Sequence, residues 1–436
     1  MSTQTSPFRI ANFRAFWFAR LATTLAQYAM MLIIGWQTYN LARDGGMSVG
    51  EASGQLALIG LLQFVPLFLL TPFTGLAADR FDRRLLGQLT ALLQLVCAGV
   101  LAAFTWQDTI SLWVLYVVAV VLGVVRAFAG PALSALAPNL VPKEILPSAI
   151  ALSSISWQVG MIVGPAVGGV LYEIVPALPY AVGGVLFLVA AVCLAFIRDL
   201  PRQKPRAPAH PIQQIREGMV YVWRNKMVLG SITLDLFAVF LAGATALFPV
   251  YARDILQVGA TGLSQLAMAP AIGAALTALW FSFRPLKNHV GPLMLLSVAA
   301  FGAATIVFAF STSMVLSLAM LFIVGSADMF SVYIRQSLIQ LHTPDEKRGR
   351  VSAVSQLTIS ASNEFGDFFS GSLAFLIGPV AAVALGGVGA IVTVGLWAVL
   401  FPVLRTTRTF EPPEELLETD EDSDGNTASD PARKGA

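Results

Sequence analysis

The chain alternates between long apolar runs and short polar segments that hold most of its Gly, Pro and charged residues. A bilayer core of about 30 Å requires about 20 apolar residues in one helix. The first six runs of roughly this length are 16–40, 57–74, 85–104, 112–128, 148–171 and 180–197. The second six are 227–250, 262–282, 292–310, 314–334, 351–377 and 380–404. The pattern therefore predicts an all-α polytopic membrane protein with twelve transmembrane helices.

Composition agrees with this pattern and excludes several other classes of protein. Of the 436 residues, 56% are hydrophobic and 12% are charged, whereas soluble chains carry about 25% charged residues. The two cysteines, Cys97 and Cys193, lie in apolar runs, so a disulfide scaffold is excluded. No soluble basic domain is present to hold a nucleic acid. The lipid bilayer is the first expected partner.

Lys and Arg are distributed unequally between the two sets of loops. One set, with the flanks of the first and last spans, holds 20 of them, and the opposite set holds only Arg43 and Arg253. Because cytoplasmic loops carry the excess of Lys and Arg, both termini are expected in the cytoplasm.

The spans and the polar segments between and after them divide the chain into four parts. Residues 1–197 and 227–404 each hold six spans. Residues 198–226 are predicted to form a cytoplasmic linker that begins with several prolines and contains a short interfacial amphipathic helix over 212–223. Residues 405–436 form an acidic tail with the composition of a disordered segment.

The two halves carry an internal repeat. Shifting the fourth and fifth spans by 202 residues aligns identical residue types. The aligned pairs are Leu136 and Leu338, Pro142 and Pro344, Glu144 and Glu346, Ser153 and Ser355, Gly164 and Gly366, and Gly169 and Gly371. Such a repeat predicts two pseudo-symmetric halves of six helices each.

The segment after the second span resembles motif A (G-x-x-x-D-R-x-G-R-R) of the major facilitator superfamily. The matching residues are Gly75, Asp79, Arg80, Arg83 and Arg84. Asp82 replaces the usual glycine. A carboxylate here can face a helix N-terminus or an arginine, and the arginines can bind carboxylates. The resemblance implies a latch on the cytoplasmic side, whereas a merely positive loop would explain only the arginines.

The fifth span carries Gly160, Gly164, Pro165, Gly168 and Gly169. Glycines four residues apart line one helix face and allow a neighbouring backbone to approach closely, and a proline can bend the helix. The pattern resembles motif C of antiporters and exporters in the same superfamily, which implies export rather than uptake.

Charged residues inside predicted spans are costly and usually functional. Arg126 belongs to a segment of the fourth span that is similar to motif B of proton-coupled members, and Asp328 occupies the equivalent position in the tenth span. The two are candidates for an ion pair between the halves, unless Arg126 snorkels to the cytoplasmic surface. Arg335, seven residues after Asp328 on the same face, is a further charge-pair candidate and is expected near the inner surface, as a latch or a snorkelling group.

Acidic residues within the spans are candidates for proton coupling. Glu364 and Asp367 share one face of the eleventh span, and Glu364 lies 13 residues after Val351, about 20 Å along a helix. An acid near the midplane is expected to be protonated part of the time, as proton coupling requires. A permanently neutral acid in a structural hydrogen bond is the alternative. Asp328 and Asp235 complete the set.

Polar and aromatic residues of the first and tenth spans outline a candidate substrate cavity. They are Gln27, Trp36, Tyr333 and Gln336. An aromatic cavity with few charges would fit an amphipathic organic molecule, and lipid-facing packing is the alternative for each residue.

Segments 325–328, 348–351 and 362–364 further resemble the bacterial branch of the superfamily that contains enterobactin exporters and drug:proton antiporters. The resemblance implies a monomeric secondary transporter of the bacterial inner membrane that exports a small organic molecule in exchange for protons by alternating access. The alternative function is that of an importer or facilitator on the same scaffold. The identity of the substrate is not encoded in any motif.

The sequence gives little support for an enzyme. His210, His289 and His342 lie in predicted cytoplasmic loops, and no Cys/His cluster has the spacing of a metal site. A phosphate-binding GxxxxGK(S/T) segment is also missing from the sequence, so neither a metal nor a cofactor is expected. A filter-like segment typical of ion channels is missing as well.

Overall fold

The computed structural model describes residues 6–80, 82–136, 139–198 and 211–410. The first six long helices are α1 (Ala11–Asp44), α2 (Val49–Arg80), α3 (Arg83–Trp106), α4 (Leu112–Leu136), α5 (Leu146–Ile174) and α6 (Leu178–Ala195). The remaining long helices are α8 (Lys226–Leu241), α10 (Gly259–Phe283), α11 (Val290–Ala309), α12 (Met314–Leu341), α13 (Asp345–Ile377) and α14 (Pro379–Leu400). The short elements are η1 (Pro7–Arg9), η3 (Lys143–Ile145), α7 (Pro211–Arg224), η4 (Thr245–Leu247), α9 (Phe248–Val250), η5 (Tyr251–Ile255) and α15 (Pro402–Thr406).

Eleven helical segments in the described ranges are long and apolar enough to cross a membrane. The twelfth is α13, whose 33 residues begin with a run of charged side chains and whose predominantly apolar part is only Phe365–Ile377. The polar first half of α13 lowers its mean hydropathy without interrupting the helix. The predicted all-α fold with twelve transmembrane helices is therefore confirmed.

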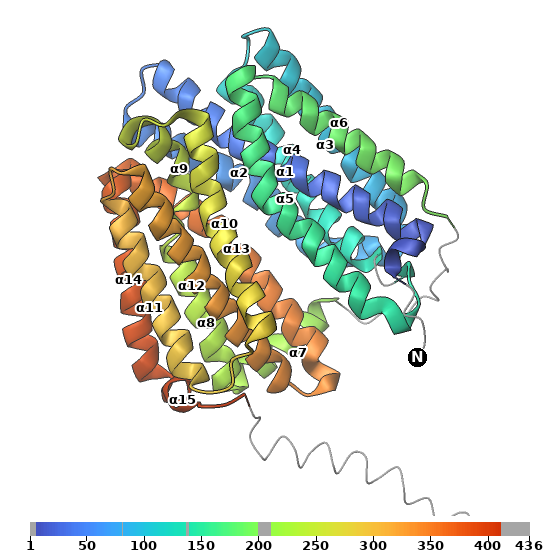
Figure 1. Cartoon of the computed structure of the whole chain (residues 1–436), viewed down its shortest axis with the longest axis vertical. Helices are drawn as coiled ribbons and strands as arrows, with labels where there is room; N and C mark the ends of the chain where they lie inside the picture. The colour runs from blue at the N-terminus through green and yellow to red at the C-terminus, as the bar shows by residue number, and fades with distance from the viewer. Residues whose placement is uncertain (1–5, 81, 137–138, 199–210, 411–436) are drawn as a thin grey trace, which may run out of the picture.

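The long helices form two groups, α1–α6 and α8–α14 (Figure 1). We call the end of the molecule with the start of α1 and with α7 the terminal end, and the end with the turns 45–48 and 256–258 the distal end. Between the groups, α2 packs against α13 and α5 packs against α10. In Figure 1 the groups meet at the distal end, in the upper part of the view, and spread apart toward the terminal end.

The hydrophobic cores, like the helices, are joined at the distal end and separate toward the terminal end. At the distal end, one core joins the two groups, because Tyr39 of α1 packs with Phe248 and Tyr251 from the second group. Toward the terminal end the cores are separate: Phe16 lies in a core of the first group and Met294 in a core of the second. The molecule is therefore closed at its distal end.

Glycines related by the internal repeat make equivalent contacts within the two groups. Gly164 of α5 packs on α1, and Gly366 of α13 packs on α8. A Cβ atom on Gly164 would lie 2.8 Å from the carbonyl oxygen of Leu25, and one on Gly366 would lie 3.1 Å from that of Phe240. The sequence repeat thus corresponds to a repeated helix packing.

A second repeated pair of glycines joins the two groups instead. A Cβ atom on Gly169 of α5 would lie 2.5 Å from the carbonyl oxygen of Ala260 in α10. One on Gly371 of α13 would lie 2.8 Å from the Cβ of Ala57 in α2. Each position tolerates only a hydrogen atom because two backbones meet there. Both contacts belong to the distal closure.

The helix α7 is attached to the terminal end of the second group. Glu217 forms an ion pair of 2.8 Å with Arg350 of α13, and the hydroxyl of Tyr221 donates a 2.8 Å hydrogen bond to the main-chain carbonyl of His342. Burial lowers the pKa of His342, which favours a neutral imidazole at this contact. On its other face α7 exposes Met219 and Trp223.

Candidate functional site

The seventh predicted span is broken rather than continuous. We expected one helix over 227–250, but α8 ends at Leu241 and the chain continues through η4, α9 and η5 to Ile255. The break lies where Gly243 approaches α13: a Cβ atom on it would lie 3.1 Å from the carbonyl oxygen of Gly366 and 3.2 Å from Oγ of Ser370. Irregular backbone at membrane depth is tolerated only where protein or a polar cavity surrounds it. Interrupted transmembrane helices of this kind form binding sites in transporters.

Asp367 lies beside this break, between the two groups of helices. The hydroxyl of Thr245 donates a 2.9 Å hydrogen bond to its Oδ1. From the other group, Gly60 of α2 faces it, since a Cβ atom there would lie 4.0 Å from the Cβ of Asp367. Asp367 precedes the distal end of α13 by ten residues, about 15 Å along the helix. An acid at this depth is costly, so its presence marks a candidate functional site.

Glu364 lies one turn before Asp367 on α13, but its side chain is outside the described part of the structure. The same holds for the side chains of Gly75, Asp79 and Arg80 in the motif A segment. Their expected roles stay predictions.

The remaining part of the motif A segment begins α3. The Asp82 carboxylate accepts a 2.8 Å hydrogen bond from the backbone N–H of Arg84 and so caps the helix. The Arg84 guanidinium donates to the carbonyl oxygen of Ile197, at the end of the first group. The aspartate that replaces the usual glycine therefore acts as an N-cap.

Phenylalanines next to Asp367 form a cluster that the sequence did not distinguish from ordinary core residues. Phe365 stacks on Phe240 of α8, with ring centroids 5.7 Å apart and an interplanar angle of 15°. It also contacts Phe64 of α2 at 5.7 Å, and Phe369 lies 4.9 Å from Phe240. The cluster thus connects both groups, and 41% of Phe365 is exposed. We call these four residues the phenylalanine wall.

Arg335, one of the charge-pair candidates, is paired inside the second group of helices. Its guanidinium forms an ion pair with Asp235 of α8, and the side chains are 2% and 7% exposed. Arg335 is therefore a buried partner within the second group rather than a snorkelling group at the inner surface. The carboxylate of Asp235 is therefore engaged by Arg335 in this conformation.

The predicted pair between Arg126 and Asp328 is not formed among the described residues. Arg126 instead donates a 3.4 Å hydrogen bond to Oε1 of Gln63 on α2. Asp328 is half-buried on α12. Their pseudo-symmetric positions belong to helices that pack within their own groups, α4 on α2 and α12 on α10.

The four predicted cavity residues have different surroundings. Trp36 is buried in the distal core, and Tyr333 stacks on Phe281 with ring centroids 4.2 Å apart. Both therefore contribute to packing in this conformation. Gln27 and Gln336 are half-buried, and their contact with a substrate stays a prediction.

The motif C glycines hold α5 against two other helices. Gly160, Gly164 and Gly168 face α1, where Cβ atoms on the outer two would meet Thr24 at 2.5 Å and Ala29 at 3.2 Å. Gly169 faces α10 of the other group. Pro165 lies inside α5 without ending it. The motif therefore supports both the packing of the first group and the contact between groups.

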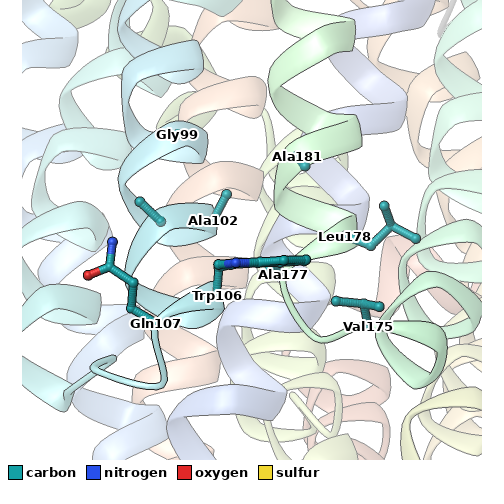
Figure 2. Close-up of a pocket in the computed structure, with 9 residues that line it drawn as sticks. Gly99, Ala102, Trp106, Gln107, Val175, Ala177, Leu178 and Ala181 are labelled. Carbon is teal, nitrogen blue, oxygen red and sulfur yellow. The ribbon is translucent and has the colours of Figure 1, made fainter.

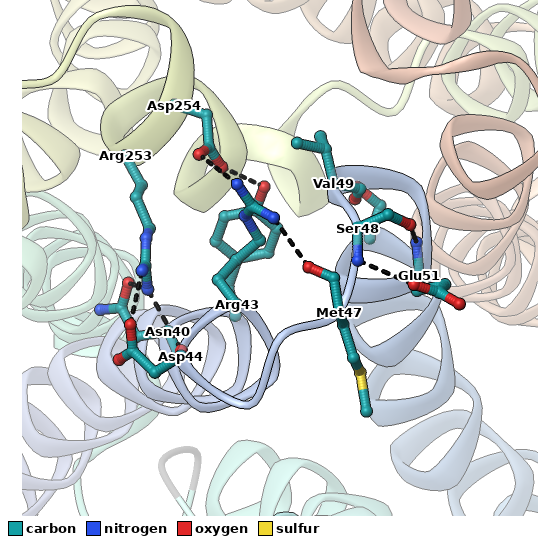
Figure 3. Close-up of polar contacts among 11 residues, drawn as sticks. Asn40, Arg43, Asp44, Met47, Ser48, Val49, Glu51, Arg253 and Asp254 are labelled. Carbon is teal, nitrogen blue, oxygen red and sulfur yellow. Dashed lines mark hydrogen bonds and ion pairs between the residues drawn. The ribbon is translucent and has the colours of Figure 1, made fainter.

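Two crossed ion pairs close the distal end (Figure 3). Arg43 of α1 contacts Asp254 of η5 at 3.2 Å, and Arg253 of η5 contacts Asp44 of α1 at 2.6 Å. The hydroxyl of Tyr39 also donates to Asp254. The two cations that the sequence places in the sparsely charged loops thus both connect the two groups.

A separate apolar cavity of about 510 Å³ lies between α3, α6 and the turn that follows α5 (Figure 2). Its lining residues are Gly99, Ala102, Ala103, Trp106, Gln107, Val175, Ala177, Leu178 and Ala181. All of them belong to the first group of helices. The cavity is therefore distinct from the site around Asp367.

Two pseudo-symmetric groups of six helices that are closed at one end, with a broken helix and an acid between them, define a secondary transporter. The sequence profile of the Major Facilitator Superfamily matches residues 16–367. The chain belongs to this superfamily.

Comparisons with individual proteins agree with this family assignment. The chain is 27% identical over 369 residues to the multidrug efflux pump Tap of Mycobacterium tuberculosis, which covers 81% of this chain and 86% of Tap. It is 26% identical over 310 residues to the enterobactin exporter EntS of Escherichia coli, which covers 69% of this chain and 72% of EntS. The solved structure of the nucleoside transporter NupG has the same fold, with a TM-score of 0.70, 11% identity and coverage of 89% of this chain and 100% of NupG. A D-xylose-proton symporter also has this fold, with a TM-score of 0.66, 14% identity and coverage of 88% and 96%.

Proposed function

We propose that this transporter exports small organic molecules across the bacterial inner membrane in exchange for protons. The observation that carries the proposal is the position of Asp367, between the two groups of helices and beside the broken helix. Motif C and the similarity to Tap and EntS favour export. Residues 1–197 and 227–404 would move as the two halves, within a monomer.

The unequal distribution of Lys and Arg supports a cytoplasmic location for the terminal end. With that orientation, the conformation described here is closed to the outside by the crossed ion pairs and the distal core. Substrate would enter from the cytoplasm between the separate terminal ends of the two groups. The motif A segment would close that side in the alternate conformation.

Glu364 and Asp367 would carry the coupling proton. In the outward-open conformation they would take up a proton as the substrate leaves, and in the inward-open conformation they would release it. Because an isolated charge is unstable at membrane depth, a binding event that neutralises the site would favour the change of conformation. Asp328 is a further candidate, whereas Asp235 is occupied by Arg335.

The phenylalanine wall supports an amphipathic, aromatic substrate. Phe365 presents a partly exposed ring next to Asp367, and aromatic rings pair favourably with one another in offset or edge-on geometries. Multidrug efflux by Tap and enterobactin export by EntS suggest two probes, ethidium and enterobactin.

Everted membrane vesicles that contain the protein are expected to accumulate at least one of these probes when a proton gradient, acidic inside, is applied. The gradient drives accumulation because protons leave through the transporter as the probe enters. Probe fluorescence in the vesicles measures the uptake, and vesicles without the protein are the control.

Addition of an uncoupler is expected to abolish the accumulation. Accumulation that survives the uncoupler would contradict proton coupling. Equilibration of a probe in both directions, driven only by its own gradient, would instead support a facilitator.

A further inference from the structure

We propose that Thr245 is a positioning residue that connects Asp367 to the crossed ion pairs at the distal end. The connection is the segment formed by η4, α9 and η5, residues 245–255, which we call the coupling segment. The inference rests on the proposed function for the role of Asp367, and it assigns a task to a part of the chain that no motif identified.

The first end of the coupling segment is attached to α13 rather than to α8. Residues 242–244 are not helical, so the segment does not continue the hydrogen-bond pattern of α8. The 2.9 Å hydrogen bond from Thr245 to Asp367 attaches the segment to α13 beside this break. A hydrogen bond to a carboxylate is stronger than one between neutral groups. The position of the segment therefore depends on Asp367.

The middle of the coupling segment is tightly packed. Leu247, Phe248 and Val250 are at most 3% exposed. Tyr251 stacks on Phe308 of α11 with ring centroids 4.5 Å apart, and its hydroxyl donates a 2.9 Å hydrogen bond to the carbonyl of Ala309. Since closely packed interiors deform little, a displacement at one end of such a segment reaches the other end.

The second end of the coupling segment crosses to the first group of helices. Arg253 contacts Asp44 at 2.6 Å and donates a hydrogen bond of 2.6 Å to Oδ1 of Asn40, while Asp254 pairs with Arg43 at 3.2 Å. Eleven residues thus join the acid beside the broken helix to the contacts that close the distal end. We infer that the Thr245–Asp367 hydrogen bond favours distal closure.

The experiment measures the distance between two spin labels at the distal end by pulsed electron paramagnetic resonance. Labels are attached to cysteines at Thr109 and Thr312, which are exposed in distal turns of the first and second groups, after both native cysteines are replaced by alanine. Thr245→Val removes the hydroxyl and keeps the size of the side chain. The ratio of distal-open to distal-closed molecules is expected to rise about fivefold, as the loss of one net hydrogen bond predicts.

Two further variants decide the outcome. Thr245→Ser keeps the hydroxyl and is expected to restore the distances of the parent protein. Arg253→Ala is expected to raise the distal-open population as well, and Thr245→Val added to it should have less than its separate effect because both act through one segment. Thermal unfolding of Thr245→Val should show no more than the small loss of stability that one net hydrogen bond predicts, because Thr245 is exposed.

Distances in Thr245→Val that equal those of the parent, or equal effects of the valine and serine variants, would overturn this inference. Vesicle transport that stays proton-driven alongside such distances would leave the proposed function intact. Uncoupler-insensitive transport would contradict the proposed function even if Thr245→Val shifts the distances.

Discussion

Replacement of Arg335 by methionine is expected to lower the free energy of unfolding by about 3–5 kcal/mol, because removal of one partner leaves a buried charge without compensation. The partner is Asp235, which is 7% exposed and lies against Arg335 between α12 and α8. Thermal unfolding of the purified protein in detergent measures the effect.

The double variant Asp235→Leu with Arg335→Met is the matched control. Since a buried ion pair can often be replaced by apolar residues of similar volume without loss of stability, this variant should regain most of the stability that Arg335→Met loses. If the stable double variant also transports at the parent rate, the pair is structural. A single variant with unchanged stability would contradict the ion pair.

Valine at Gly169 is expected to shift the protein from the distal-closed toward the distal-open conformation by about 5- to 150-fold. Already a Cβ atom there would lie 2.5 Å from the carbonyl oxygen of Ala260 in the other group, and overpacking costs about 1–3 kcal/mol. The contact exists only while the distal ends meet, so the cost falls on the closed conformation alone. Spin-label distances between Thr109 and Thr312 measure the shift.

Gly371→Val should have the same effect, because Gly371 occupies the equivalent position against Ala57. The control is Gly164→Val, in the same helix α5 as Gly169. The contact of Gly164 with Leu25 lies within the first group. This control variant should reduce stability without changing the ratio of conformations. A similar shift in all three variants would mean that Gly169 and Gly371 have no special part in the closure.

Hydropathy and the internal repeat predicted much of this fold. The spans were recognisable because lipid requires long apolar helices, and the aligned pairs at Gly164 and Gly169 indicated where backbones approach. The repeat could not tell which contacts lie within a group and which lie between groups. That distinction depends on the relative placement of the halves, which the alignment of one half on the other does not contain.

The site was only partly predictable. Asp367 stood out because acids are rare in apolar runs, whereas Thr245 and the phenylalanine wall lie among residues of ordinary type for a span. The break near Gly243 lies where this residue contacts Gly366, more than 120 positions away. Only Gly243 and Pro249 hinted at it locally.

The partners of the charged residues were also not predictable from the sequence. Arg126 and Asp328 share a position in the repeat. Helix packing nevertheless places Arg126 in a hydrogen bond with Gln63 and Arg335 in an ion pair with Asp235. Sequence spacing fixes the depth of a residue along its helix. It does not fix the helix that the residue faces.

The most direct test of the account is the counterflow of protons in proteoliposomes that enclose a pH-sensitive dye. A gradient of ethidium or enterobactin, whichever the vesicles accumulate, should drive protons in the opposite direction through the parent protein. The double variant Glu364→Gln with Asp367→Asn should still bind the probe but move no protons, and Asp108→Asn in an exposed distal turn should behave like the parent. Proton counterflow at the parent rate in the double variant, at every pH tested, would contradict the account.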